Sequence, residues 1–154
     1  METLNLDKKK ILEYQQNKDP YLFVDCATEI IPGKSAKGYK KFNESEWYFK
    51  VHWPSDPNVP GMLQIEALVQ MSSLTIVTLP NYKNKILYLT GANNLKFYKK
   101  IIPGMTLNME TLVKSFKRGI ATFEAKGYVD KILACQANFT LILPEEIKKY
   151  NLGK

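Results

Sequence analysis

The chain has 154 residues, 45% of them hydrophobic and 24% charged, which is the size and balance of one globular domain with its own core. Its 22 basic residues outnumber its 15 acidic ones, and the net charge of +7 suits either an anionic partner or a solvated lysine-rich surface. Cys26 and Cys135 lack a metal-binding spacing, which argues against a zinc site and favours reduced thiols in the cytoplasm.

The N-terminal segment is polar. METLNLDKKKILEYQQ contains no apolar stretch typical of a signal peptide. Residues 5–17 are predicted to form a short helix whose apolar contacts are Leu4, Ile11 and Leu12.

Strand patterns lie on both sides of the centre of the chain. The run YLFVDCATEII (21–31) leads through the turn Pro32-Gly33 into KGYKKF (37–42), which is typical of two paired strands. Further strands are predicted over residues 85–102, 105–117, 120–130 and 131–143. Their turn-like boundaries indicate an antiparallel meander.

The longest apolar run, residues 61–79, is predicted to form a helix. Pro60 precedes it, and a proline at a helix start loses no hydrogen bond. Gln64, Glu66 and Gln70 interrupt the run and argue against a membrane span. Because the helix is apolar on nearly all sides, we expect a sheet to wrap around it.

No internal repeat or low-complexity tract divides the sequence. We therefore expect residues 1–154 to form a single α+β domain. In that domain one long helix lies against a mainly antiparallel sheet.

Two residues stand out as chemically informative. His52 is the only histidine and lies in a proline-rich loop, and Glu66 follows on the apolar helix. A buried carboxylate is costly without partners, and a structural role explains either residue when it is considered alone. Gln70 is four residues after Glu66, so its amide is placed to hydrogen-bond the carboxylate.

The start of the helix adds a third chemical group. Free backbone N–H groups near Gly61 and Met62 can polarise a carbonyl oxygen. A histidine base, a buried carboxylic acid and such a donor are the groups needed to remove a proton next to a carbonyl and expel a β-hydroxyl.

The stretch HWPSDPNVPGMLQIEALVQ resembles the signature of 3-hydroxyacyl-acyl-carrier-protein dehydratases. The matching residues are His52, Pro54, Pro57, Pro60, Gly61, Leu63, Glu66, Ala67 and Gln70. DPYLFVD (19–25), IIPGK (30–34) and LKFYKKIIPGM (95–105) are similar to further segments of that family, and the resemblance spans about residues 10–143.

The resemblance implies a hotdog fold, a homodimer and often a trimer of dimers. It implies an active site between subunits, in which His52 of one chain faces Glu66 of the other. His52 would take the C2 proton and Glu66 would protonate or position the 3-hydroxyl, directly or through water. The Gly61 amide would hold the thioester carbonyl, and Gln70 would orient Glu66.

The remaining expectations concern the substrate and its carrier. Tyr88 and Phe97 fall where the family places aromatics along the acyl tunnel, although both are equally well explained as strand residues. No metal or organic cofactor is expected, because the acyl group arrives on the phosphopantetheine of an acidic acyl carrier protein. Basic residues expected around the tunnel mouth are Lys96, Lys99, Lys100, Lys114, Lys117 and Arg118. No motif supports nucleic-acid binding.

The chain departs from the family pattern around the histidine. Val51 and Ser55 stand where glycines are usual, and Asn58 replaces a small apolar residue. The glutamate is typical of enzymes that only dehydrate, whereas the flanking loop is more like the branch that also isomerises the new double bond. A hotdog thioesterase and a non-catalytic subunit that binds acyl carrier protein remain the alternatives, and the acyl chain length stays open.

Overall fold

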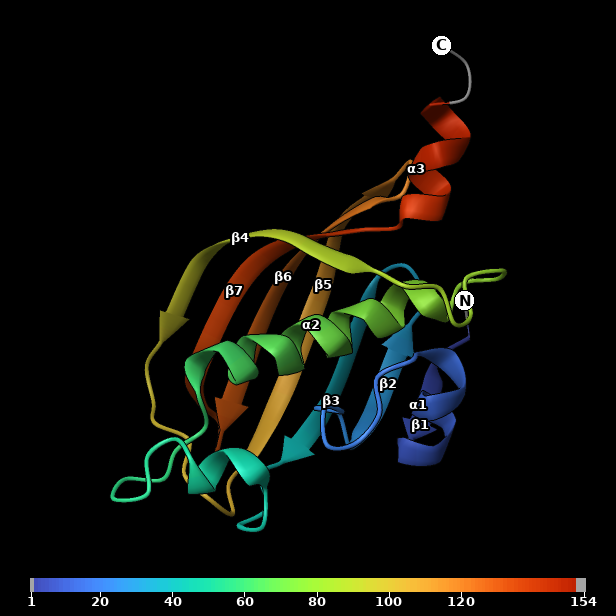
Figure 1. The fold of residues 1–154 in the computed structure, drawn as a ribbon. Coiled ribbons are helices and arrows are strands. Elements are labelled where there is room, and N and C mark those ends of the chain that lie inside the picture. The colour runs from blue at the N-terminus through green and yellow to red at the C-terminus, as the bar shows by residue number, and fades with distance from the viewer. Residues whose placement is uncertain (1, 152–154) are drawn as a thin grey trace.

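The computed structural model describes residues 2–151 as a curved antiparallel sheet wrapped around one long helix (Figure 1). This is the α+β arrangement predicted from the sequence. The elements in chain order are β1 (Leu4–Asp7), α1 (Lys8–Tyr14), β2 (Cys26–Ile31), β3 (Ser35–Lys41), the 3-10 helix η1 (Trp47–Lys50), α2 (Gly61–Val77), β4 (Tyr88–Phe97), β5 (Thr106–Lys117), β6 (Ile120–Val129), β7 (Ile132–Ile142) and α3 (Pro144–Asn151).

Helix α2 is the centre of the core. Its 17 residues span about 26 Å, and 12 of them are buried, which explains a sequence that is apolar on nearly all sides. It packs on β2, β3, β5, β6 and β7. The predicted helix over 61–79 ends two residues early, because Leu79 precedes Pro80 and is disfavoured in the helical conformation. Within residues 2–151, none of the helices has both the length and the apolarity needed to cross a membrane.

The sheet order is β1-β2-β3-β5-β6-β7-β4. Strands β5, β6 and β7 form the predicted meander, with residues of positive φ at both hairpin turns: Arg118, Gly119, Asp130 and Lys131. The prediction that all four later strands form one meander was wrong, because β4 pairs with β7 and not with β5.

The connection after β4 explains this difference. It leaves β7, where the Tyr98 N–H donates to the Ala134 carbonyl, and reaches the end of β3, where the Gly104 N–H donates to the Phe42 carbonyl. Strand β5 therefore enters the sheet beside β3. As a result β4 forms one edge of the sheet, opposite the edge formed by β1 (Figure 1).

The N-terminal prediction was partly wrong. The helix covers only Lys8–Tyr14, and the residues before it form β1, which pairs with β2. Asp7 ends the strand and caps the helix, since its carboxylate accepts a hydrogen bond from the Lys10 N–H at 2.9 Å. Of the expected apolar contacts Ile11 is buried, Leu4 lies in the strand and Leu12 is exposed.

Candidate active site

The His52 loop connects η1 with α2 and holds the histidine through its backbone and its ring. The His52 N–H donates to the carbonyl of Tyr48 at 2.8 Å, which continues the turn of η1. The imidazole stacks on Trp53 with ring centroids 4.3 Å apart. Its Nδ1 lies 3.3 Å from the carbonyl oxygen of Asn58.

That last contact selects a tautomer of the imidazole. A carbonyl oxygen only accepts hydrogen bonds, so the Nδ1 atom of His52 carries the proton in this pairing. In the neutral ring the lone pair then lies on Nε2. The loop thus holds His52 in the form in which Nε2 acts as a base.

An open hollow of about 470 Å³ lies beside His52. Its lining comes from the loop, the first turn of α2 and the chain after β4: His52, Trp53, Asn58, Val59, Gly61, Gln64, Phe97, Tyr98, Lys99 and Lys100. Phe97 packs directly on the backbone of Gly61. A Cβ added to the glycine would lie only 3.0 Å from the ring. Glycine lets the aromatic ring approach the helix start this closely, and a Cβ at this position would require the ring to shift by a few tenths of an ångström.

The first turn of α2 presents unpaired donors at this hollow. The N–H groups of Leu63 and Gln64 donate to the Pro60 carbonyl. Among residues 2–151 the N–H groups of Gly61 and Met62 have no acceptor. They lie at the positive end of the helix dipole, where a carbonyl oxygen that gains negative charge is stabilised.

Glu66 lies one turn further along α2 and is held by Gln70. The Gln70 side-chain amide donates to the Glu66 carboxylate at 2.8 Å, which confirms the hydrogen bond predicted from their spacing. The same amide donates to the Tyr21 carbonyl at 2.9 Å and accepts the Phe23 N–H at 2.8 Å. Burial raises the pKa of Glu66, and the hydrogen bond from Gln70 opposes this rise.

This use of Gln70 corrects the predicted strand over 21–31. Strand β2 begins only at Cys26, because the backbone of residues 21–23 is hydrogen-bonded to a helix side chain and not to a neighbouring strand. The amide takes the place of a strand partner. The segment before β2 is thereby fixed to the part of α2 that carries Glu66.

The expected site residues fall into separate groups within one chain. His52, Gly61 and Phe97 line the hollow, whereas Glu66 pairs with Gln70 outside its lining. No hydrogen bond or ion pair within residues 2–151 joins His52 to Glu66. Tyr88 lies at the opposite end of β4 from Phe97, about 30 Å away along the strand.

The basic residues are also divided. Lys99 and Lys100 line the hollow, whereas Lys117 and Arg118 lie at the far end of β5. Lys100 donates to both carboxylate oxygens of Asp56 at 2.9 and 2.7 Å, so it ties the chain after β4 to the His52 loop. The expectation that all six basic residues surround one opening therefore does not hold in this chain.

The roles of two residues of the hollow were not predicted from the sequence. Asn58 contributes its carbonyl, which the identity of its side chain does not reveal. The Gln64 amide donates to the Val59 carbonyl at 3.1 Å, and its buried oxygen has no partner among the described residues. A polar residue in the first turn of an apolar helix was the available signal for Gln64.

Comparison with known proteins gives consistent matches. A family model described as FabA-like domain matches residues 16–138. The 3-hydroxyacyl-[acyl-carrier-protein] dehydratase FabZ of Clostridium novyi (strain NT) is 36% identical over 135 residues, which are 86% of this chain and 95% of the relative. The protein of the same name from Alkaliphilus metalliredigens (strain QYMF) is 36% identical over 143 residues, 93% of this chain and 95% of the relative.

Solved structures resemble the chain in fold. The dehydratase heterocomplex ApeI:P from Xenorhabdus doucetiae matches with a TM-score of 0.71 at 11% identity, over 94% of this chain and 97% of that one. The uncharacterized protein PH1136 from Pyrococcus horikoshii matches with a TM-score of 0.65 at 15% identity, over 86% and 92% of the two chains. These likenesses identify the helix wrapped by a sheet as a hotdog fold.

Proposed function

Because the chain belongs to the FabA-like family of hotdog proteins, together with the 3-hydroxyacyl-acyl-carrier-protein dehydratases, we propose that it is such a dehydratase. It removes water from a 3-hydroxyacyl group on acyl carrier protein and leaves a trans-2-enoyl thioester, as a step of fatty-acid or specialised acyl-chain synthesis. The observation that carries the proposal is the His52 imidazole, whose contact through Nδ1 leaves the Nε2 lone pair free, and which lines the same hollow as Gly61 at the start of α2.

Each group has a role in the reaction. Nε2 of His52 takes the proton from C2, and the electron pair moves towards the thioester carbonyl, whose oxygen binds the Gly61 N–H. The electron pair then returns to form the double bond between C2 and C3, the bond between C3 and its hydroxyl breaks, and the hydroxyl leaves as water as it receives a proton. Glu66 supplies that proton, directly or through a water molecule, or positions the hydroxyl for the proton that His52 carries.

Burial suits Glu66 to this role. A raised pKa keeps a larger share of the carboxyl groups protonated near neutral pH, and a protonated carboxyl donates to a leaving hydroxyl. Gln70 fixes one carboxylate oxygen and thereby orients the other. The reaction moves protons and electron pairs without net oxidation or reduction, so the proposed mechanism uses neither a metal nor an organic cofactor.

The two groups meet in a homodimer. Within residues 2–151 no hydrogen bond joins His52 to Glu66, and β4 is an edge strand along which nine of ten residues are exposed. Such an edge presents unpaired backbone groups and apolar side chains, including Tyr88, Leu89 and Phe97, to a second copy. In the dimer His52 of one subunit faces Glu66 of the other, and three dimers assemble into a hexamer.

The carrier and the acyl chain approach from the side of the hollow. Lys99 and the net positive charge favour an acidic acyl carrier protein, whose phosphopantetheine delivers the thioester. Phe97, and Tyr88 from its own end of β4, contribute to the acyl tunnel. Residues 1–154 act as one dehydratase unit in the cytoplasm, where Cys26 and Cys135 stay reduced.

The test is turnover of 3-hydroxyacyl carrier proteins of varied chain length, followed by the mass of the carrier. Loss of one water is the expected result. Release of free carrier thiol would identify a thioesterase, and binding without turnover would identify a non-catalytic subunit. Either result would overturn the proposal. A cis-3-enoyl product, which has the same mass and is distinguished by NMR of the acyl chain released from the carrier, would add isomerisation to the activity.

A further inference from the structure

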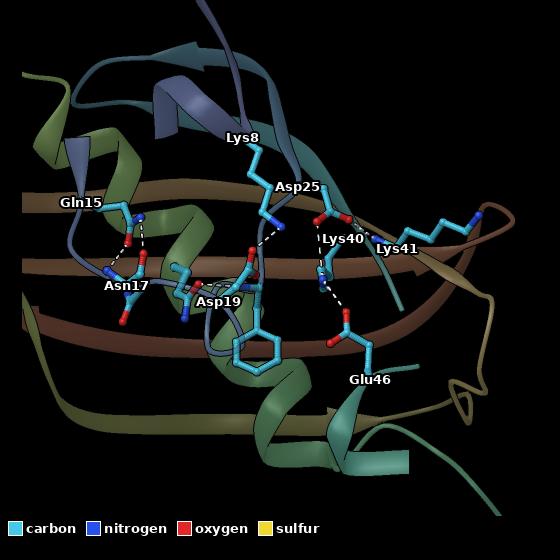
Figure 2. A network of polar contacts seen from close by, with 10 residues as sticks. Lys8, Gln15, Asn17, Asp19, Asp25, Lys40, Lys41 and Glu46 are labelled. Carbon is cyan, nitrogen blue, oxygen red and sulfur yellow. Dashed lines mark hydrogen bonds and ion pairs between the residues drawn. The ribbon is translucent and has the colours of Figure 1, made fainter. Parts of the chain in front are cut away.

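A buried lysine lies close to the segment that leads into the His52 loop. The Lys40 ammonium group is 3.0 Å from a carboxylate oxygen of Glu46 and 3.4 Å from one of Asp25 (Figure 2). The Lys40 side chain is 4% exposed, and those of Glu46 and Asp25 are 19% and 23% exposed. We call these three residues the Lys40 triad.

The triad joins a rigid part of the fold to a loop. Lys40 lies in β3 between β2 and β5, and the other carboxylate oxygen of Asp25 accepts the backbone N–H of Lys41 at 2.7 Å (Figure 2). Two members are therefore fixed to the sheet. Glu46 is the N-terminal flanking residue of η1, so its ion pair with Lys40 ties η1 to β3.

A short chain of contacts leads from the triad to the histidine. Glu46 accepts the Phe49 N–H through its carbonyl, and the carbonyl of Tyr48 accepts the N–H groups of Val51 and His52. Tyr48 is fully buried and packs on Phe42 from the end of β3. From Glu46 onward this segment is a continuous series of tight turns that ends at His52, so a shift of Glu46 moves the imidazole.

The energetics argue against stability as the reason for the triad. Buried ion pairs are commonly replaced by apolar residues without loss of stability, because desolvation offsets their attraction. The other inward positions of β3 are Ala36 and Gly38, which shows that this face of the strand accepts small uncharged residues. Unlike an apolar residue, the ammonium group of Lys40 holds the carboxylate of Glu46 in one position.

We propose that Lys40 and Glu46 are positioning residues that set the place of the His52 imidazole at the start of α2. The inference rests on the proposed function, in which His52 is the base. A displaced base lowers the rate of proton removal while binding of the acyl carrier protein is kept. A misplacement of about 1 Å is enough for a loss of up to roughly a hundredfold in turnover.

His52 is the only histidine, so its imidazole can be observed without an assay of activity. The protein is labelled with isotopic histidine, without a histidine tag, and the imidazole NMR signals are recorded for Lys40→Met and Glu46→Gln. Shifted or broadened signals are expected for both. Lys83→Met is the matched control. Lys83 is an exposed lysine that follows the C-terminal end of α2, and the substitution removes its ion pair with Glu13. Unchanged signals in Lys40→Met would overturn the inference.

Kinetics then distinguish positioning from general damage. At a temperature where all variants are folded, Lys40→Met and Glu46→Gln should lower kcat at least tenfold with little change in KM. The double variant should lose little more than either single variant, and Lys40→Arg should restore part of the rate. In a His52→Ala background Lys40→Met should have no further effect. An additional loss of rate in that background would show that Lys40 does not act through His52. If the wild-type protein shows no turnover, the proposed function is overturned, and the NMR signals alone then decide whether Lys40 positions the His52 imidazole.

Discussion

The His52 loop and the Glu66 face of α2 form two halves of one candidate site, and they are built differently. The loop is open, its imidazole rests on one long hydrogen bond and a stacked indole, and Trp53 is 57% exposed. Glu66 lies on the central helix, and Gln70 fixes it to the backbone of Tyr21 and Phe23. The helix half is complete within one chain, whereas the loop half presents its base to a surface.

This difference indicates which contacts position the catalytic side chain in each half. The carboxyl group is positioned by the core of its own subunit, so its geometry should persist in a monomer. The imidazole depends on η1, the Lys40 triad and whatever closes the hollow, so its geometry should depend on assembly.

Removal of either chemical group should abolish most of the activity. We expect His52→Ala and Glu66→Gln each to lower kcat by about a thousandfold, because each removes a proton-transfer group. Both variants should keep their melting temperature within a few degrees, since neither position is part of the buried apolar core. Full turnover in either variant, measured by the mass of the carrier, would refute the assigned mechanism.

Mixing the two inactive variants should restore activity if the halves belong to different subunits. A dimer of one His52→Ala and one Glu66→Gln chain has one site with both defects and one intact site. Random mixing of equal amounts should therefore give roughly a quarter of the wild-type turnover. The control is the same mixture assayed at high protein concentration immediately after mixing, before the subunits exchange. No recovery after verified exchange would place both groups in the same chain.

Gly61→Ala tests the start of α2. The new Cβ would lie 3.0 Å from the Phe97 ring, so it should displace the ring or the helix start and lower kcat/KM at least tenfold. Lys37→Ala on β3 is the control, because its side chain is exposed and lies neither in the hollow nor on the edge strand β4. That variant should keep kcat/KM within about twofold in the same carrier assay. Equal losses in the two variants would argue against a role for the Gly61 N–H.

The smallest effect concerns stability and pH. Burial raises the pKa of Glu66 in the folded chain, so the stability that protonation contributes is fully present below the ordinary pKa and is lost as pH rises through the raised value. Glu66→Gln removes this ionisation. It should raise the melting temperature by a few degrees at pH 7 to 8, with the difference shrinking as pH falls towards the ordinary carboxyl pKa of 4.5.

The control for this measurement is Glu44→Gln, which neutralises an exposed carboxylate in the loop before η1. It should change the melting temperature little at any pH. If Glu66→Gln is no more stable than the wild type at pH 8, the carboxyl group has a charged or hydrogen-bonded partner that a single chain lacks.

The central helix and the later hairpins were predictable because their signals are local. The long apolar run with helical spacing predicted α2. Arg118-Gly119 predicted a turn, and both residues do have positive φ. Strand β1 was missed although LNLD alternates apolar and polar residues, because four residues are a short signal and the strand is ordered by its pairing with β2. Helix α3 did have a signal, since Pro144 is followed by two glutamates and then by two lysines, an order that suits the helix dipole.

The candidate site was predictable in its residue types and not in its supports. The spacing of Glu66 and Gln70 predicted their hydrogen bond, but no local pattern shows that Gln70 also binds residues 21 and 23. The place of β4 in the sheet depends on a connection that runs from β7 to β3, which sequence periodicity does not encode. The inward position of Lys40 follows from strand alternation with Ala36 and Gly38, so the triad could have been suspected from the sequence.

Phe97 is both the last residue of the exposed edge strand β4 and the ring that rests on Gly61. If β4 is where a second copy pairs, formation of that pair fixes the ring and with it the start of α2. Catalytic competence would then vary with protein concentration. On dilution, specific activity should fall along the same curve as the fraction of dimer, and the enzyme would be switched off by separation of its subunits without unfolding either of them.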